Sequence, residues 1–322
     1  MMNFSTIIPI QKSQNSLSYD SKIVLLGSCF ATTIGEKFEY FKFKNTTNPF
    51  GIVFNPVSIE RLIERVVNKK EFTENDIFFH NERWHCYEVH SDLSQSNKEE
   101  FLRNLNAILQ STSNQINKST HLIITYGTSW VYTLKSTKEV VANCHKVPQK
   151  EFEKKIVSVE NIEKSIQNTI LLIQKVNPSC NFIFTISPVR HIKDGFVENQ
   201  LSKAHLITAL HSAICNLAFA NYFPSYEIMM DELRDYRFYA EDMLHPNSVA
   251  INYIWERFFT TQISDKVHAV MNEVCSIQRG LAHRPFNPDA ESHQQFLSKL
   301  EDKMALIQKQ FPEIGFEIRL NI

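Results

Sequence analysis

Glycine is scarce in this chain: only 7 of its 322 residues are glycine. A loop that cradles phosphate groups uses about three glycines within a few residues, and no stretch of the sequence supplies them. The sequence therefore lacks both the P-loop and the dinucleotide-binding fingerprint.

Basic and acidic residues are balanced in number, and apolar residues form no long run. Lysine and arginine number 34 and aspartate and glutamate 35, which gives a formal net charge of -1. A near-neutral chain gains little from the counterion release that drives nucleic-acid binding, so we expect no nucleic-acid partner. No run of about 18 apolar residues is present, and no basic start precedes an apolar stretch, so we expect neither a membrane span nor a secretory signal.

Cysteines are dispersed, and no two of them form a C-x-x-C pair. This pattern is typical of free thiols in a reducing compartment, so we expect a cytoplasmic protein without a disulfide framework or a zinc site. His80, His85 and His90 recur at a spacing that does not place all three on one face of a strand. We therefore expect no metal and no cofactor. The cysteines are Cys29, Cys86, Cys144, Cys180, Cys215 and Cys275.

Short apolar runs alternate with stretches of helical spacing. Continuous apolar strands are buried on both faces, as in a parallel sheet, and their alternation with helices is typical of layered α/β folds. The sequence therefore predicts a three-layer α/β/α sandwich with a mainly parallel sheet of about five strands. We expect strands at 22–26, 122–126, 181–186 and 226–230, and helices at 31–43, 98–109, 159–176, 201–222 and 247–274.

Two segments interrupt this alternation, and one follows it. Residues 77–90 and 131–142 alternate polar and apolar side chains around short turns, which predicts two β-hairpin insertions. The segment from Arg284 to Pro288 breaks the chain, and a charged helix is expected at about 290–310. We therefore predict a catalytic domain over residues 1–280 and a C-terminal helical extension over residues 281–322.

Three of the predicted strands end in unusual residues: Gly27-Ser28-Cys29, Gly127-Thr128-Ser129-Trp130 and Ser187-Pro188-Val189-Arg190-His191. Ligands of open α/β sheets bind outside the carboxyl ends of the strands, so we expect these residues to meet at one rim. Cys29 follows a strand and opens a helix, where the helix N-terminus lowers the pKa of a thiol. Cys29 is thus placed either to be a nucleophile or to be a buried structural cysteine.

Asp242 and His245 lie three positions apart, before the last helix of the domain. In such a turn the carboxylate can fix the imidazole tautomer through one ring nitrogen while the other faces a nucleophile. The alternative is a helix cap beside a surface histidine. Pro246 is expected at the first position of the following helix.

At this point the sequence resembles a known family. The signature Gly27-Ser28-Cys29-Phe30-Ala31 is the one for which the GSCFA family is named, and that family is similar to the SGNH, or GDSL-type, hydrolases. The resemblance implies a flavodoxin-like fold and ester chemistry, with Cys29 at the position of the nucleophilic serine and Ser28 beside it as the alternative nucleophile. Further matching segments are Asn48-Pro49-Phe50-Gly51, Gly127-Thr128-Ser129-Trp130-Val131-Tyr132, Asn143-Cys144-His145-Lys146-Val147-Pro148, Ser187-Pro188-Val189-Arg190-His191 and Asp242-x-x-His245-Pro246.

The same resemblance implies an oxyanion hole made of the nucleophile's own N–H, a glycine and an asparagine. Gly51 is the candidate glycine. The block at Gly127 lacks the expected asparagine, so either Ser129 or Asn143 is the candidate third donor.

Three further polar residues are candidates for substrate contact. His145 is either an acid, base or substrate contact or a histidine bonded to backbone. Arg190, beside His191, either clamps a carboxylate or phosphate of the acyl donor or forms an ion pair with Asp194 or Asp231.

These residues support two functions of different classes. The first is an acyl-ester hydrolase or acyltransferase that uses Cys29, His245 and Asp242 on an O-acylated small molecule or saccharide. The second is a catalytically silent protein that binds a carbohydrate or acylated ligand. The sequence leaves open the acyl group, the acceptor, the choice between hydrolysis and transfer, and the oligomeric state.

Overall fold

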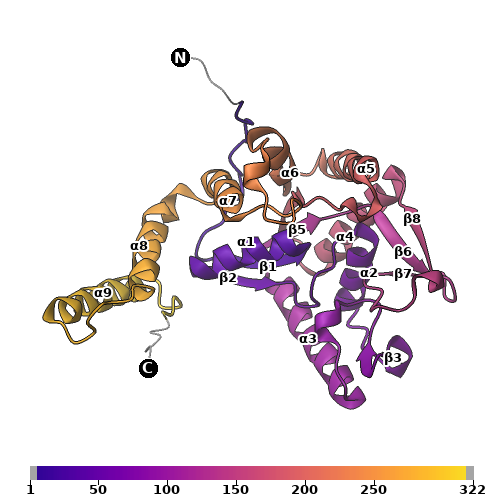
Figure 1. Ribbon diagram of the computed structural model, residues 1–322, viewed down its shortest axis with the longest axis horizontal. Coiled ribbons are helices and arrows are strands. Elements are labelled where there is room, and N and C mark those ends of the chain that lie inside the picture. The colour runs from indigo at the N-terminus through magenta and orange to yellow at the C-terminus, as the bar shows by residue number, and fades with distance from the viewer. Residues whose placement is uncertain (1–5, 317–322) are drawn as a thin grey trace.

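A five-stranded sheet lies at the centre of the computed structural model, which describes residues 6–316 (Figure 1). All neighbouring strands in it are parallel, in the order β10-β9-β5-β1-β2. Counted along the chain this is the order 2-1-3-4-5, the flavodoxin-like arrangement, whose ligand crevice lies where β1 and β5 diverge. The strands are β1 (Lys22–Gly27), β2 (Lys44–Thr47), β5 (His121–Tyr126), β9 (Asn181–Ile186) and β10 (Ala220–Phe223).

Alternate residues of β1, β5, β9 and β10 enter two separate cores. In β1, Ile23 and Leu25 pack on one side of the sheet, and Val24 packs on the other. The first core contains the apolar faces of α1 (Cys29–Tyr40), α7 (Ser248–Gln262) and α8 (Asp265–Leu281). The second contains those of α2 (Pro56–Val67), α3 (Lys98–Lys118), α4 (Val159–Val176) and α5 (Phe196–Ile214). This confirms the predicted three-layer α/β/α sandwich.

Both predicted hairpins form. Strands β3 (Phe78–His80) and β4 (Arg83–His85) pair around Asn81 and Glu82, which both have positive φ angles of 44° and 61°. Strands β6 (Trp130–Leu134) and β7 (Val140–Val141) form the second hairpin, which β8 (Phe152–Ile156) extends to a three-stranded sheet.

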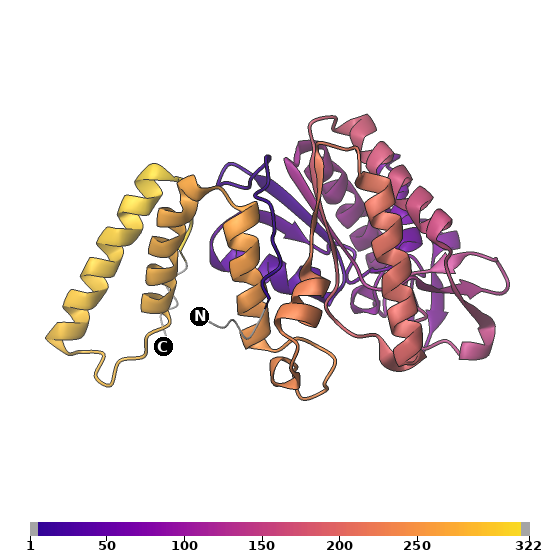
Figure 2. The same ribbon diagram turned by 90° about the horizontal axis from the view of Figure 1, so that it is seen from above.

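The chain ends in a helical arm. Figure 2 shows α8 and α9 (Glu291–Gln310) side by side, beyond α7 and away from the sheet. A side chain at Gly280 of α8 would lie 2.8 Å from Leu300 of α9, so the two helices approach closely there. The arm confirms the predicted C-terminal helix. The domain boundary at residue 280 stays a prediction.

Five expected elements differ from the structure. The helix expected at 98–109 continues to Lys118 as α3. Residues 226–230, expected as a strand, are helical and lie within α6 (Ser225–Glu227) and the π-helix Ile228–Glu232. The fifth strand is instead β10, which was expected to be the end of the helix at 201–222. The helix expected at 31–43 ends at Tyr40, and the polar edge strand β2 follows it. The helix expected at 247–274 is two helices, because Ile263 forms a β-bridge with Leu17 and Ser264 caps α8.

Pro246 lies before the helix start and not inside it. The side chain of Asn247 caps α7 by accepting the N–H groups of Val249 and Ala250, and the helix begins at Ser248. No helix within residues 6–316 combines the length and the apolar character needed to cross a membrane.

Candidate functional site

The site begins at the sharp turn between β1 and α1. Gly27 has a φ of 136°, and a Cβ atom there would lie 2.2 Å from the carbonyl oxygen of Thr125 on β5. Its N–H donates to the side-chain oxygen of Asn48 at 2.8 Å. Glycine is therefore required for β1 to run this close to β5 and then turn into the helix.

Ser28 is the N-cap of α1. Its hydroxyl accepts the N–H of Phe30 at 3.3 Å, and only 1% of the residue is exposed. Cys29 is the first residue of the helix and is half-buried. The serine hydroxyl is thus engaged in holding the helix start, whereas the adjacent Cys29 is only partly buried.

The thiol of Cys29 is less acidic than the sequence predicts. Burial raises its pKa, and this effect outweighs the N–H groups of Phe30 and Cys29 and the charge of Lys203, which all lower it. The charge of Asp242 adds to the increase. The expectation of a thiol made acidic by the helix N-terminus is therefore wrong, because the same fold that places Cys29 at the helix start also removes it from water.

Asp242 and His245 form the expected pair. Their side chains lie 2.5 Å apart, between carboxylate Oδ2 and ring Nδ1, while Oδ1 accepts the N–H groups of Leu244 and His245. Those two N–H groups and the ring hold the pKa of Asp242 at about 2. The carboxylate therefore keeps the proton on Nδ1, which leaves Nε2 free to accept one.

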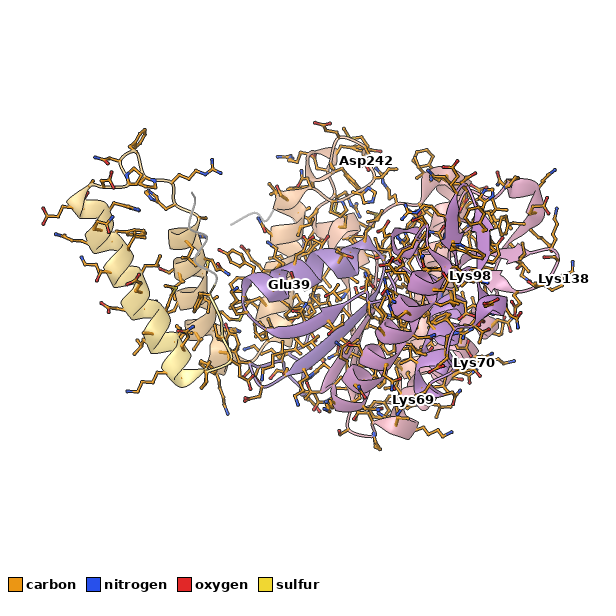
Figure 3. All side chains as sticks on the ribbon, turned by 90° about the horizontal axis from the view of Figure 1, so that it is seen from below. Glu39, Lys69, Lys70, Lys98, Lys138 and Asp242 are labelled. Carbon is orange, nitrogen blue, oxygen red and sulfur yellow. The ribbon has the colours of Figure 1, made fainter. Side chains whose placement is uncertain are left out.

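The pair lies on an exposed loop. Figure 3 shows Asp242 on this loop at the edge of the molecule, and the side chain of His245 is 49% exposed. The loop is attached to the rim because the N–H of Arg190, after β9, donates to the carbonyl of Leu244 at 3.2 Å. Among the described residues, no hydrogen bond joins Cys29 to His245, although the charge of Asp242 acts on Cys29.

Arg190 supports this loop as well. Its guanidinium donates to the carbonyl of Met243 and lies over the rings of Tyr239 and Tyr236, at 4.4 and 5.2 Å. The ion pair considered for Arg190 is absent from the described part of the chain. Both of the acidic residues considered have other partners: Asp194 pairs with Lys154, and Asp231 with Arg234.

His191 is held neutral beneath the loop. Its ring stacks on Phe54 at 5.3 Å, and its buried Nε2 has no hydrogen-bond partner within residues 6–316. Burial, together with the charges of Lys203 and His245, lowers the pKa of His191 to about 3. Gly127 packs against the same two rings, since a Cβ atom there would lie 2.8 Å from Phe54 and 3.2 Å from His191 Nε2.

Two of the three candidate oxyanion donors, Gly51 and Ser129, already donate within the protein. The N–H of Gly51 donates to the carbonyl of Asn48 at 2.8 Å. The hydroxyl of Ser129 donates to the carbonyl of Ser202 at 3.3 Å. Asn143 accepts the N–H of His145 through its side-chain oxygen at 2.8 Å, which orients the amide in its own turn but does not use the NH2 group that would donate. The N–H of Cys29, at the first turn of α1, donates to no oxygen atom among the described residues and acts on its own sulfur instead.

His145 belongs to the hairpin region. Its Nε2 lies 2.7 Å from the carbonyl of Cys86, its ring centre is 4.8 Å from that of His85, and burial lowers its pKa to about 4. These contacts support the alternative of a histidine bonded to backbone. In residues 6–316, no cluster of three histidine, cysteine or acidic side chains has the geometry to hold a metal ion.

Lys203 was missed by the sequence analysis. It lies on α5 with 1% of its surface exposed, and its ammonium donates to the carbonyls of Gly127 and Ser187 at 2.8 and 2.7 Å. A signal was present, because Lys203 shares the apolar stripe of its helix with Leu206 and Leu210. A charged residue on a buried helical face is rare and warrants a functional explanation.

Two family models match the chain. The one described as the GSCFA family matches residues 22–258, and the one described as the GSCFA domain protein, C-terminal domain, matches residues 274–320. No curated protein gives a match. The first match extends from β1 into α7 and so includes the whole candidate site.

Proposed function

The chain belongs to the GSCFA family, and from this premise we propose that it is a cysteine-dependent acyl-ester hydrolase or acyltransferase. The substrate class we propose is an O-acylated small molecule or saccharide, with no nucleic acid or membrane as partner. We also propose that the family is a branch of the SGNH hydrolases, because the strand order and the order of Cys29, Asp242 and His245 along the chain fit that pattern.

The observation that carries this proposal is the pair of Asp242 and His245 on the same rim as Cys29. A protein that only binds has no need of a carboxylate that fixes an imidazole tautomer beside a thiol. The free Nε2 of His245 takes the proton of Cys29 as the loop closes on substrate, because apo geometry at such sites is often loose.

The chemistry then follows in two steps. The sulfur of Cys29 attacks the ester carbonyl carbon, and the negative charge on the carbonyl oxygen is stabilised by the N–H of Cys29. The carbon–oxygen bond to the alcohol breaks, His245 returns the proton to the leaving oxygen, and a thioester remains. Water, or an acceptor alcohol or amine, attacks the thioester, gives its proton to His245 and releases the thiol.

Turnover of a panel of p-nitrophenyl and O-acyl sugar esters tests this proposal. Cys29→Ala should abolish turnover, whereas Cys215→Ala, at an exposed cysteine, should leave it unchanged. If Ser28→Ala is inactive and Cys29→Ser is fully active, the nucleophile is Ser28.

The second candidate function is a catalytically silent binding protein. Two observations favour it: the raised pKa of Cys29, and the absence of a Cys29–His245 hydrogen bond among the described residues. It predicts that iodoacetamide labels Cys29 no faster than the half-buried Cys144 and that no ester is turned over. We further propose a cytoplasmic location, which the six free cysteines support.

A further inference from the structure

A buried ammonium lies at the rim without a carboxylate partner. Lys203 donates to two backbone carbonyls, those of Gly127 and Ser187, and none of the salt bridges within residues 6–316 includes it. Burying a lysine costs free energy that neutral carbonyls repay only in part. Lys203 therefore brings an ionisable group into the interior without a carboxylate in contact with it, and Glu227 acts on it only from beyond ion-pair distance.

The strand register places this charge at the level of the nucleophile. Gly27 of β1 pairs with Thr125 of β5, which pairs with Thr185 of β9. Cys29, Gly127 and Ser187 each follow one of these paired residues by two positions. Because adjacent strands lie about 4.8 Å apart, an ammonium bound to Gly127 and Ser187 is close to the start of α1.

Four groups face Lys203 from the elements around it. Cys29 on α1 and Glu227 on α6 both favour its charged form, and the ring of Tyr226 lies 5.4 Å from its Nζ. His191, in the loop after β9, is kept neutral in part by this charge. Desolvation dominates and lowers the pKa of Lys203 to about 7, so the lysine changes its charge near neutral pH.

We infer that Lys203 is a positioning residue whose ammonium stabilises the thiolate of Cys29 from inside the protein. The inference rests on the proposed function, in which Cys29 is the nucleophile. Burial opposes ionisation of this thiol, and His245 stands on an exposed loop. The charge of Lys203, present as long as the lysine is protonated, is what favours the thiolate from inside the protein. The reactivity of the site is thereby coupled to the protonation of one buried lysine.

The test is the rate at which iodoacetamide alkylates Cys29 between pH 6 and 9, in wild type and in Lys203→Met. At pH 6 to 7 the variant should react about tenfold more slowly, the size expected for two charges a few ångströms beyond contact. The two alkylation rates should become equal towards pH 9, because Lys203 is then deprotonated in the wild type and carries no charge. Lys175→Met, at an exposed helical lysine, is the control and should match the wild type.

If Lys203 has a purely structural role, Lys203→Met should be alkylated more slowly than wild type by the same factor at every pH. Either that result or equal alkylation rates in the two proteins would overturn the inference. Should Lys203→Met not fold, His245→Gln alone gives the answer. Its labelling rate should rise about tenfold between pH 7 and 9, because loss of the ammonium opposes thiolate formation, whereas a single independent thiol gives about a hundredfold rise. Labelling needs no ester, so a protein without ester turnover can still pass or fail this test.

Discussion

The buried lysine makes the stability of the protein depend on pH in a way that one substitution removes. Folding lowers the pKa of Lys203 from its ordinary value of 10.5 to about 7. A lysine whose folded pKa is lowered binds fewer protons in the folded than in the unfolded state between these values. Its contribution to the free energy of unfolding therefore increases as pH rises through that window.

The magnitude follows from the width of the window. The full difference between the two pKa values corresponds to about 5 kcal/mol, since each pH unit is worth about 1.4 kcal/mol. Tyrosines such as Tyr19, whose pKa burial raises, act in the opposite direction at high pH, so the comparison is best confined to pH 7 to 9. Between pH 7 and 9, the free energy of unfolding of the wild type should rise by about 2 kcal/mol more than that of Lys203→Met.

Urea unfolding at pH 7, 8 and 9 measures this difference. Both proteins carry the same remaining titratable groups, so subtracting one curve from the other leaves Lys203 together with the pKa shifts that its charge imposes on Cys29 and His191. Lys175→Met should follow the wild type at every pH. Parallel curves for wild type and Lys203→Met would refute the reasoning, because they would mean that Lys203 has the same pKa in the folded and unfolded chains.

Three further substitutions test the geometry of the rim. Asp242→Asn keeps the oxygen that accepts the N–H groups of Leu244 and His245 but presents an amide N–H to the imidazole ring. Turnover should fall by less than the roughly 10⁴-fold seen for a serine triad, and the melting curve should not change. A normal turnover rate would show that the Asp242–His245 pair takes no part in the chemistry. Ser28→Ala should lower the free energy of unfolding in urea by about 1 kcal/mol, because the helix cap is lost, and should retain part of the turnover. Complete inactivity of a folded Ser28→Ala protein would contradict the assignment of Cys29 as the nucleophile. Gly27→Ala should destabilise the protein by about 2 kcal/mol or more, because its Cβ atom meets the Thr125 carbonyl at a positive φ, and a melting temperature equal to wild type would show that the turn is not constrained.

Local sequence pattern predicted the centre of the fold well. Strands β1, β5 and β9 are continuous apolar runs buried on both faces, and such runs carry a strong signal. The edge strands carry a weaker one: β2 is Lys-Asn-Thr-Thr, and β10 follows a helix without a break in apolar spacing. The apolar run at 226–230 resembles a strand, but Pro224 ends β10 before it and the chain turns into α6.

In the candidate site, too, local contacts could be predicted from the sequence and long-range contacts could not. The contact between Asp242 and His245 is local, three residues apart, so their spacing sufficed to predict it. The environment of Cys29 is set by distant segments that bury it, and the partner carbonyls of Lys203 lie 76 and 16 residues away along the chain. Burial and long-range contacts of this kind are properties of the packed fold, which short motifs do not encode.

The central claim is that Cys29 forms a covalent acyl intermediate. Its most direct test is intact-mass and peptide mass spectrometry after rapid acid quenching of the protein with an activated acyl ester. The account predicts one added acyl group, which fragmentation of the peptide locates on Cys29 and not on the adjacent Ser28, and which hydroxylamine removes. The acylated protein should accumulate in His245→Ala if release of the acyl group is slowed more than its transfer to the thiol. Acylation of Ser28, or of none of the peptides while ester is consumed, would contradict it.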